Sequence, residues 1–139
     1  MQLLSARRNG LRAGGISNAS RFTYPYDDVP VGFVAGKVED IWLHIAEIDV
    51  RPDWQRHVIG RRLMQTLLCI GQQRGLTGAT LTTDNMVAFN ARLYGRLGFK
   101  IVEGLARPPH LVSLNADEIA KGFNQARRAA MCVTFRALG

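Results

Sequence analysis

The chain has 139 residues, of which 47% are hydrophobic and 21% are charged. A single domain of about this length buries roughly 68–70% of its unfolded surface, so it can form a core without disulfides or metals. The near-average composition excludes a disordered or fibrous protein, and no apolar run reaches the ~18 residues of a membrane-spanning helix. Cys69 and Cys132 are the only cysteines. Two are too few for a disulfide framework, which predicts reduced thiols and a cytoplasmic location.

The net charge is +7, from 18 lysines and arginines against 11 acidic residues. Taken alone, such an excess suggests a nucleic-acid partner. The excess is confined to two segments, however: residues 1–21 hold four arginines and no acid, and residues 51–62 hold four arginines and one acid. The other ten basic residues balance the other ten acidic ones. Two local patches do not make a basic stripe over the domain, so neither nucleic acid nor a membrane is the expected partner.

The first predicted elements are a tail and a hairpin. Residues 1–21 are rich in Gly, Ser, Asn and Arg without a sustained hydrophobic period, which predicts a flexible basic tail. One domain is expected over residues 22–139. It opens with two β-prone runs, 22–26 and 29–37, and Asp27-Asp28 between them predicts a hairpin.

A third strand is predicted over residues 41–50, and its apolar side chains change parity midway. These five side chains are Ile41, Leu43, Ile45, Ile48 and Val50. A one-residue slip in a period-two pattern predicts a β-bulge near Ala46-Glu47. The slip places His44, Glu47 and Asp49 on the face opposite the apolar residues. Because bulges redirect side chains beside active sites, this strand is a candidate site.

The rest of the chain alternates helices and strands. A turn at 51–54 precedes a long amphipathic helix over 58–74, whose apolar stripe is Ile59, Leu63, Leu67 and Ile70. The pattern then predicts a strand at 79–83, a helix from Asp84 or Asn85 to Leu97, a strand at 99–103, a loop at Pro108-Pro109, a helix from Asn115 to Gln125 and a strand at 129–135. This order predicts a mixed α+β domain built on one central, mostly antiparallel sheet with flanking helices.

The start of the long helix is a candidate anion site. Residues 55–61 follow a strand and a turn, and the free N–H groups and positive dipole end of a helix start attract anions. Four arginines surround this point: Arg51, Arg56, Arg61 and Arg62. They favour a phosphate or pyrophosphate ligand, and a solvated basic helix start is the alternative.

A second pair of candidate ligand-binding residues is Asn90 and Tyr94. They are four residues apart, so they lie on one face of the predicted helix, and both can hydrogen-bond a ligand. The histidines and cysteines, in contrast, lack metal-ligand spacing, so we predict no metal site.

Together these two elements resemble the GNAT superfamily of acetyl-CoA-dependent N-acetyltransferases, over about residues 22–135 and most strongly over 31–103. The family's first motif, Gln/Arg-x-x-Gly-x-Gly/Ala after a strand, is matched in part by residues 55–60. Its second, Asn-x-x-x-Tyr followed by Gly-Phe, is matched by Asn90, Tyr94, Gly98 and Phe99. The resemblance implies a fold like that of acyl-CoA N-acyltransferases, with a splayed and bulged strand. It also implies acetyl-CoA as co-substrate and transfer of its acetyl group to a primary amine of a small molecule or protein.

The resemblance also implies roles for individual residues. The backbone of Ile48 and Val50 would pair with the pantetheine arm, and Asn90 would contact the cofactor. Tyr94 would lie near the sulfur and protonate the leaving thiolate. The pyrophosphate would be held at the helix start by Gln55, Arg56, His57, Val58, Ile59, Gly60 and Arg61.

A general base should lie near the amine, and the bulged strand offers Glu47 and His44. His44 starts with a pKa in a useful range, whereas Glu47 would need burial to raise its own pKa. Glu47 is favoured because it lies at the bulge itself, and action through a water molecule stays open for either residue.

The sequence departs from the family pattern at two points. Val58 replaces the first motif glycine, and a β-branched residue narrows the phosphate's approach and disfavours positive φ. In addition, the family usually places a strand and two helices before the hairpin, where this chain has the basic tail. The chain is therefore either a shortened member, or a partner subunit such as a second copy covers the exposed sheet face. A non-catalytic acyl-CoA-binding or interaction module is the alternative function, and an RNA-linked amine acceptor is a third, motivated by the tail.

Overall fold

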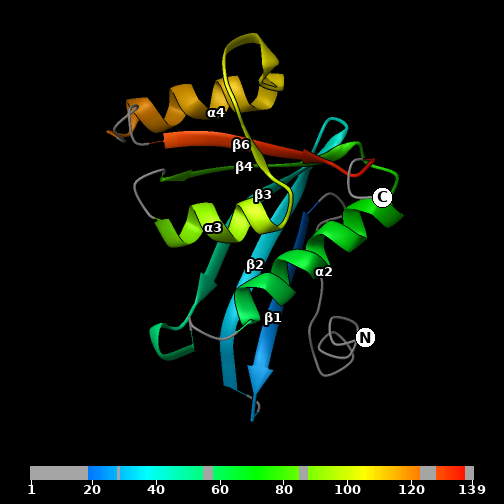
Figure 1. Cartoon of the computed structure of the whole chain (residues 1–139), viewed down its shortest axis with the longest axis vertical. Helices are drawn as coiled ribbons and strands as arrows, with labels where there is room; N and C mark the ends of the chain where they lie inside the picture. The colour runs from blue at the N-terminus through cyan, green and yellow to red at the C-terminus, as the bar shows by residue number, and fades with distance from the viewer. Residues whose placement is uncertain (1–18, 28, 55–57, 85–87, 123–127, 137–139) are drawn as a thin grey trace.

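Six strands form one sheet in the order β1-β2-β3-β4-β6-β5 (Figure 1). Their bounds are β1 Ala19–Tyr26, β2 Val29–Glu39, β3 Trp42–Val50, β4 Gly78–Asp84, β5 Lys100–Val102 and β6 Arg128–Thr134. Every neighbouring pair is antiparallel except β3 and β4, which run parallel. This computed structural model describes residues 19–27, 29–54, 58–84, 88–122 and 128–136. Within them, the predicted α+β class and mostly antiparallel sheet are confirmed.

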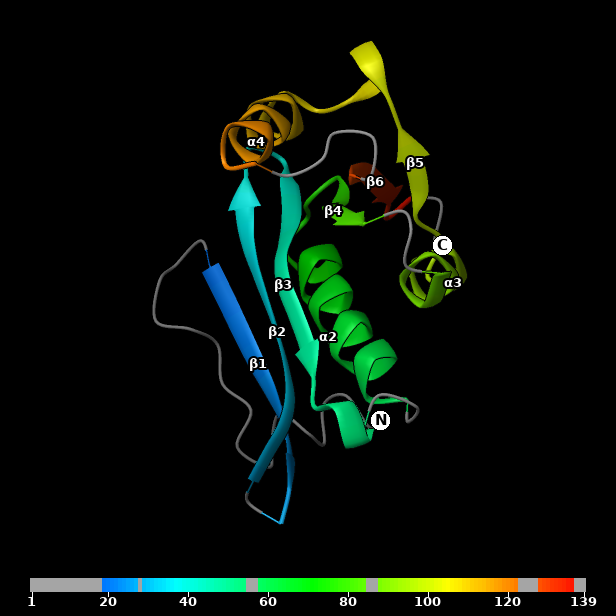
Figure 2. The same ribbon diagram turned by 90° about the vertical axis from the view of Figure 1, so that its left-hand side faces the viewer.

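Helices cover both faces of the sheet. They are α2 Ile59–Gln73, α3 Ala88–Arg96 and α4 Pro109–Ala120, together with two short 3-10 turns, η1 Pro52–Trp54 and η2 Gly104–Ala106. Figure 2 shows α2 and α3 on one side of the sheet and α4 on the other. None of the described helices is long and apolar enough to cross a membrane.

The main core lies between α2 and the sheet. Of the predicted apolar stripe, Ile59, Leu63 and Leu67 are buried, and Ile70 packs against their cluster while staying half-buried. Gly71 on the same helix permits a close approach, since a Cβ added there would lie 2.7 Å from the Cζ atom of Phe135. The amphipathic period therefore predicted this interface correctly. Helix α2 begins one residue after its expected start and ends one residue before its expected end.

Two boundaries in the first hairpins differ from the prediction. Strand β1 begins at Ala19, three residues before the expected start at residue 22. Its Arg21 guanidinium stacks over the Phe33 ring of β2, 3.8 Å from the ring centroid. Ile41 does not belong to β3 but to the β2–β3 turn, which Asp40 makes with a positive φ of 57°, and its side chain is 51% exposed. The prediction of Ile41 as an apolar strand residue is therefore wrong.

The prediction for α4 is also wrong at its N-terminus. The Pro108-Pro109 pair predicts a loop, with a helix beginning at Asn115, yet α4 begins at Pro109 itself. Proline is favoured in the first helical turn, because its fixed φ suits the helix and its missing N–H would have no partner there. The helix ends at Ala120 rather than Gln125, and Gly122 follows with a φ of 95°.

Candidate functional site

Strands β3 and β4 form a wedge. They pair only from Trp42–Gly78 to His44–Thr80 and have no paired residues beyond that point. The second half of β3 continues in register with β2, whereas β4 stays paired with β6 as far as Asp84. Figures 1 and 2 show the two strands diverging, with α2 and α3 on one side of the gap. The β4-facing edge of β3 is therefore without a neighbouring strand beside its second half.

The predicted β-bulge lies where the wedge opens. Residues Gly36 and Ala35 of β2 pair with Ile45 and Glu47 of β3, so Ala46 is the extra residue. The apolar parity changes there, as expected: Ile45 is buried in the core, and Ile48 packs against it from the diverging half of the strand. The bulge prediction is confirmed, and the physical signal for it was the slip in a period-two pattern.

A cavity of about 270 Å³ occupies the wedge. Its wall contains Ile45, Ala46, Glu47 and Ile48 of β3, Leu81, Thr82 and Thr83 of β4, Tyr94 of α3 and Arg128 of β6. Consecutive residues of a strand point to opposite faces of its sheet. Because the wall takes consecutive residues from both strands, the cavity reaches both faces of the sheet.

Tyr94 lies on the α3 side of this opening. Its side chain is 6% exposed and packs edge-on against Phe99, with the ring centroids 6.1 Å apart. Burial raises the pKa of Tyr94, and the positive charge of Arg128 opposes that rise. The phenol is therefore protonated at neutral pH, and no residue in the described ranges hydrogen-bonds its hydroxyl. It is available as a proton donor to a ligand in the wedge.

The two candidate bases on β3 occupy different surroundings. Glu47 is exposed and lines the wedge cavity, whereas His44 does not line it. Instead His44 is 5% exposed beneath α4, and its Nδ1 is 2.9 Å from the Oγ1 of Thr80. The same Oγ1 is 2.8 Å from the Nε2 of His110 on α4. A hydroxyl has one proton, so Thr80 can donate to at most one of these rings, and at least one ring nitrogen donates to its oxygen.

Burial, together with the neighbouring charges of His110 and Lys37 and against the opposing Glu39 and Glu118, lowers the pKa of His44 to about 4. Burial also lowers the pKa of His110. The two rings stand edge to face with centroids 5.5 Å apart. His44 is thus engaged in joining α4 to the sheet, and Glu47 is the β3 candidate base that borders the wedge.

Arg128 is a wedge residue that sequence reasoning missed. Its Nη2 donates to the Oε2 of Glu118 on α4 and to the Oγ1 of Thr82 on β4, both at 2.9 Å. Thr82 also donates to the same Glu118 oxygen at 2.8 Å. The side chains of Arg128 and Glu118 are only 20% and 12% exposed. The guanidinium is therefore held in one place at the opening, on the face of the sheet that α4 covers.

The start of α2 carries part of the predicted anion site. Gln55, Arg56 and His57 lie outside the described residues, and so does the side chain of Asn90 in α3. Val58 precedes the helix with a φ of −78°, which any residue adopts, so glycine is not needed there for its backbone freedom. A Cβ on Gly60 would lie 3.8 Å from both Leu93 and Val50, an ordinary contact.

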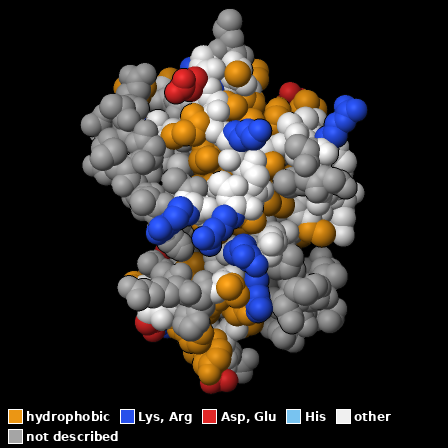
Figure 3. Space-filling view, in the orientation of Figure 1, with side chains coloured by type: hydrophobic (Ala, Val, Ile, Leu, Met, Phe, Trp, Pro, Cys, Tyr) orange, Lys and Arg blue, Asp and Glu red, His pale blue; other side chains and the backbone are white. Residues whose placement is uncertain are grey.

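The arginines near α2 do not all serve one site. Arg62 donates to the Tyr24 hydroxyl at 3.0 Å, and Arg51 pairs with Asp53 at 3.8 Å between exposed side chains. Arg61 is exposed, as are Arg92 and Arg96 of α3. Figure 3 shows basic side chains gathered over α3 and the start of α2. The basic surface at this end of the wedge therefore includes α3, which the sequence analysis did not predict.

Comparison with known proteins relates this geometry to a family. A family model described as the acetyltransferase (GNAT) family matches residues 7–99. The ribosomal-protein-S18-alanine N-acetyltransferase from Escherichia coli has a TM-score of 0.66 at 20% identity, over 86% of this chain and 71% of that protein. Nourseothricin acetyltransferase has a TM-score of 0.67 at 22% identity, over 85% of this chain and 66% of that protein.

A third structure contains a ligand. The PaiA N-acetyltransferase from Thermoplasma acidophilum, solved in complex with coenzyme A, has a TM-score of 0.65 at 13% identity, over 96% of this chain and 67% of that protein. The chain thus spans 66% to 71% of the length of these three proteins. At such identities the likeness establishes the fold.

Proposed function

The chain belongs to the GNAT acetyltransferase family, and from this premise we propose that it transfers an acetyl group from acetyl-CoA to a primary amine. The observation that carries the proposal is the opening through the sheet at the β3 bulge. A cavity bordered by Tyr94 on one face and by Glu47 on the β3 strand can receive a thioester and an amine from two sides. Such an arrangement brings two reactants together, which lowers the barrier by proximity and orientation.

The described residues fit acetyl-CoA. Beyond His44, β3 has an edge without a neighbouring strand, alongside which an amide-containing arm such as pantetheine can pair. The first turn of α2 offers backbone N–H groups to a pyrophosphate, and the exposed arginines over α2 and α3 add positive charge. A Cβ on Gly60 would make only ordinary contacts with Leu93 and Val50, so packing does not require glycine at this position. When bound, acetyl-CoA supplies an acetyl group activated as a thioester.

Each side chain then has a defined task. Glu47 takes a proton from the ammonium form of the amine, directly or through a water molecule, so that the nitrogen lone pair can bond the acetyl carbon, and the nitrogen loses a second proton to solvent as the amide forms. Tyr94 donates its phenolic proton to the sulfur, which keeps the electron pair of the broken carbon–sulfur bond. The raised pKa of Tyr94 keeps the phenol protonated until negative charge develops on the sulfur. Glu47 is exposed, so it lacks the burial that the sequence analysis asked of it, and we assign it the base role rather than His44 because only Glu47 borders the wedge.

The test combines binding with transfer. Millimolar acetyl-CoA should raise the melting temperature, because ligand at about 100 times its Kd adds about 2.7 kcal/mol to the free energy of unfolding. Gly60→Ala should fold normally, because its methyl group makes ordinary contacts, but should lose this shift if the pyrophosphate approaches the first turn of α2 as proposed. Gly95→Ala is the matched control: a Cβ there meets nothing within 4 Å, so the shift should persist.

Release of the CoA thiol in the presence of an amine panel measures transfer. Binding with transfer supports the proposal. Binding without transfer to any amine would identify the alternative, a non-catalytic acyl-CoA-binding module of the same fold. The absence of any thermal shift would overturn the proposal.

A further inference from the structure

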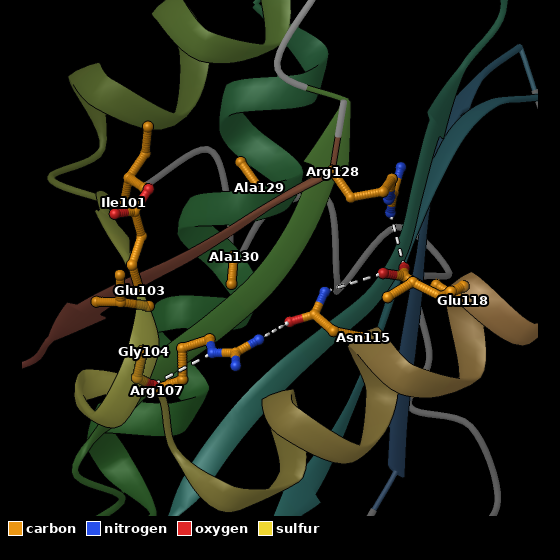
Figure 4. A pocket seen from close by; sticks show the side chains of 11 residues that line it. Ile101, Glu103, Gly104, Arg107, Asn115, Glu118, Arg128, Ala129 and Ala130 are labelled. Carbon is orange, nitrogen blue, oxygen red and sulfur yellow. Dashed lines mark hydrogen bonds and ion pairs between the residues drawn. The ribbon is translucent and has the colours of Figure 1, made fainter. Parts of the chain in front are cut away.

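A second and larger cavity lies between α4, β5 and β6 (Figure 4). Its volume is about 420 Å³, within the range of roughly 300–1,000 Å³ typical of small-molecule sites. We call it the α4 pocket. Its polar wall is made by Glu103, Arg107, Asn115, Glu118 and Arg128. Arg128 borders this pocket and the wedge cavity alike, so the two cavities are neighbours.

A row of hydrogen bonds crosses the pocket wall, as the dashed lines of Figure 4 show. The Nη1 of Arg107 donates to the Oδ1 of Asn115 at 3.0 Å, and the Nδ2 of Asn115 donates to the Oε1 of Glu118 at 3.2 Å. Arg107 also donates through Nε to the carbonyl oxygen of Gly104 at 3.3 Å. These contacts fix the orientation of the Arg107 guanidinium before any ligand arrives.

The charges along this row are unevenly compensated. Both carboxylate oxygens of Glu118 accept hydrogen bonds, and Arg128 neutralises its charge. Arg107 bonds only neutral oxygens among the described residues, and although Glu103 lines the same pocket it makes no ion pair with Arg107 there. A guanidinium that is held in place, faces a cavity and lacks an acid is suited to a carboxylate from a ligand, because its planar donors match two carboxylate oxygens.

We propose that the α4 pocket binds the acetyl acceptor, and that this acceptor is a small amine with a carboxylate group held by Arg107. The inference rests on the proposed function and specifies its acceptor. Its amine would reach the wedge past Arg128, on the face of the sheet opposite α2 and α3. Arg107 is thus a specificity residue: it binds a part of the acceptor remote from the reacting nitrogen, so its loss should raise KM more than it lowers kcat.

The experiment compares acceptors that differ in one group. Each of a set of α-amino acids is assayed beside its carboxamide and beside an aminoalkyl phosphate of similar size, with CoA thiol release as the readout. The wild-type protein should prefer the carboxylate over the carboxamide by about tenfold or more in kcat/KM, the ratio that about 1.4 kcal/mol produces. Arg107→Met should remove this preference by raising KM for the carboxylate acceptors more than KM for their carboxamides. Arg107→Lys should restore part of it.

Two further measurements separate this proposal from the proposed function. Arg136→Met, which removes an exposed arginine outside the pocket, should behave as wild type. Calorimetric titration with N-acetyl amino acids, the expected products, needs neither acetyl-CoA nor turnover and should show binding that Arg107→Met abolishes. If those products bind through Arg107 but acetyl-CoA does not bind, the carboxylate site in the α4 pocket stands, while its role as an acetyl-acceptor site fails together with the proposed function. Equal use of carboxylate and carboxamide, preference for the phosphate, or product binding unaffected by Arg107→Met would overturn the inference.

Discussion

Acid should destabilise the folded protein through His44. In the unfolded chain this side chain has a pKa of 6.5, and in the folded protein burial lowers that pKa to about 4. Between these values the unfolded chain binds a proton that the folded protein does not, so unfolding becomes more favourable as the pH falls. The stabilisation is complete above 6.5 and is lost as the pH falls through the window from 6.5 to about 4.

The size of the effect follows from the shift. A lowering from 6.5 to about 4 corresponds to about 3 kcal/mol once the pH is below both values. Most of this loss in the free energy of unfolding occurs in the first part of the pH range: it is roughly 2 kcal/mol between about pH 7 and about pH 5. His110 acts in the same direction, because burial lowers its pKa too.

Urea unfolding followed by circular dichroism at several pH values measures this loss. His44→Asn is the informative variant, since its amide can still bond Thr80 near the position of Nδ1 but does not titrate. The variant should lose about 2 kcal/mol less than the wild type on acidification from about pH 7 to about pH 5. Titration of the His44 ring by NMR should give a pKa well below 6.5 in the folded protein. An identical pH dependence in wild type and variant would refute the reasoning.

Two substitutions test the wedge directly. Tyr94→Phe removes the proposed proton donor, so kcat should fall by about 10²-fold or more while the thermal shift given by acetyl-CoA is unchanged; an unaltered kcat would exclude Tyr94 as the acid. Glu118→Gln weakens the charged bonds that hold Arg128 and Thr82, and denaturant unfolding should show a loss of about 1–3 kcal/mol. A loss below ~0.5 kcal/mol, typical of exposed pairs, would mean that the pair is effectively solvated.

The bulge could be predicted because its signal is local. The apolar parity of β3 changes within a few residues, and a slip of one residue inside a strand is typical of a bulge. The same holds for α2, whose buried stripe follows the helical period. Where two local rules compete, the prediction fails: Pro108-Pro109 is typical of a loop, but the second proline is equally suited to the first turn of α4.

The Arg128 cluster could not be predicted from local patterns. Arg128 contacts Thr82 across 46 positions of sequence and Glu118 across 10. These residues, far apart in the sequence, come into contact only because β6 pairs with β4 and α4 lies over both strands. No hydrophobic period in the sequence predicts that arrangement. The two motifs, in contrast, are short patterns of neighbouring residues, so they could point to the start of α2 and to Tyr94 from the sequence alone. Arg128 and its partners hold one another in place across the fold, and no short sequence pattern marks such residues.

Helix α4 depends on polar contacts for its position, which gives the last prediction. Leu111 is its only buried residue, and the His44–Thr80–His110 hydrogen bonds join its first turn to the sheet. Asn115, which orients Arg107, lies one to two turns further along. Release of α4 from the sheet exposes both rings, so their lowered pKa values return toward the ordinary value of 6.5, and acid favours the released form in the same way that it favours unfolding. Acidification should therefore loosen the α4 pocket before the whole chain unfolds.

Binding of N-acetyl amino acids isolates this effect, since they have no titratable amine and their carboxylates, with a pKa near ~3.5, stay ionised at about pH 5. Their affinity for the wild-type protein should fall between about pH 7 and about pH 5, and the fall should be smaller in His44→Asn, which removes one of the two titrating rings. Circular dichroism at each pH confirms that the chain is still folded. If affinity is constant down to the unfolding transition, the polar anchor does not control the pocket, and α4 is held by its remaining contacts through Glu118.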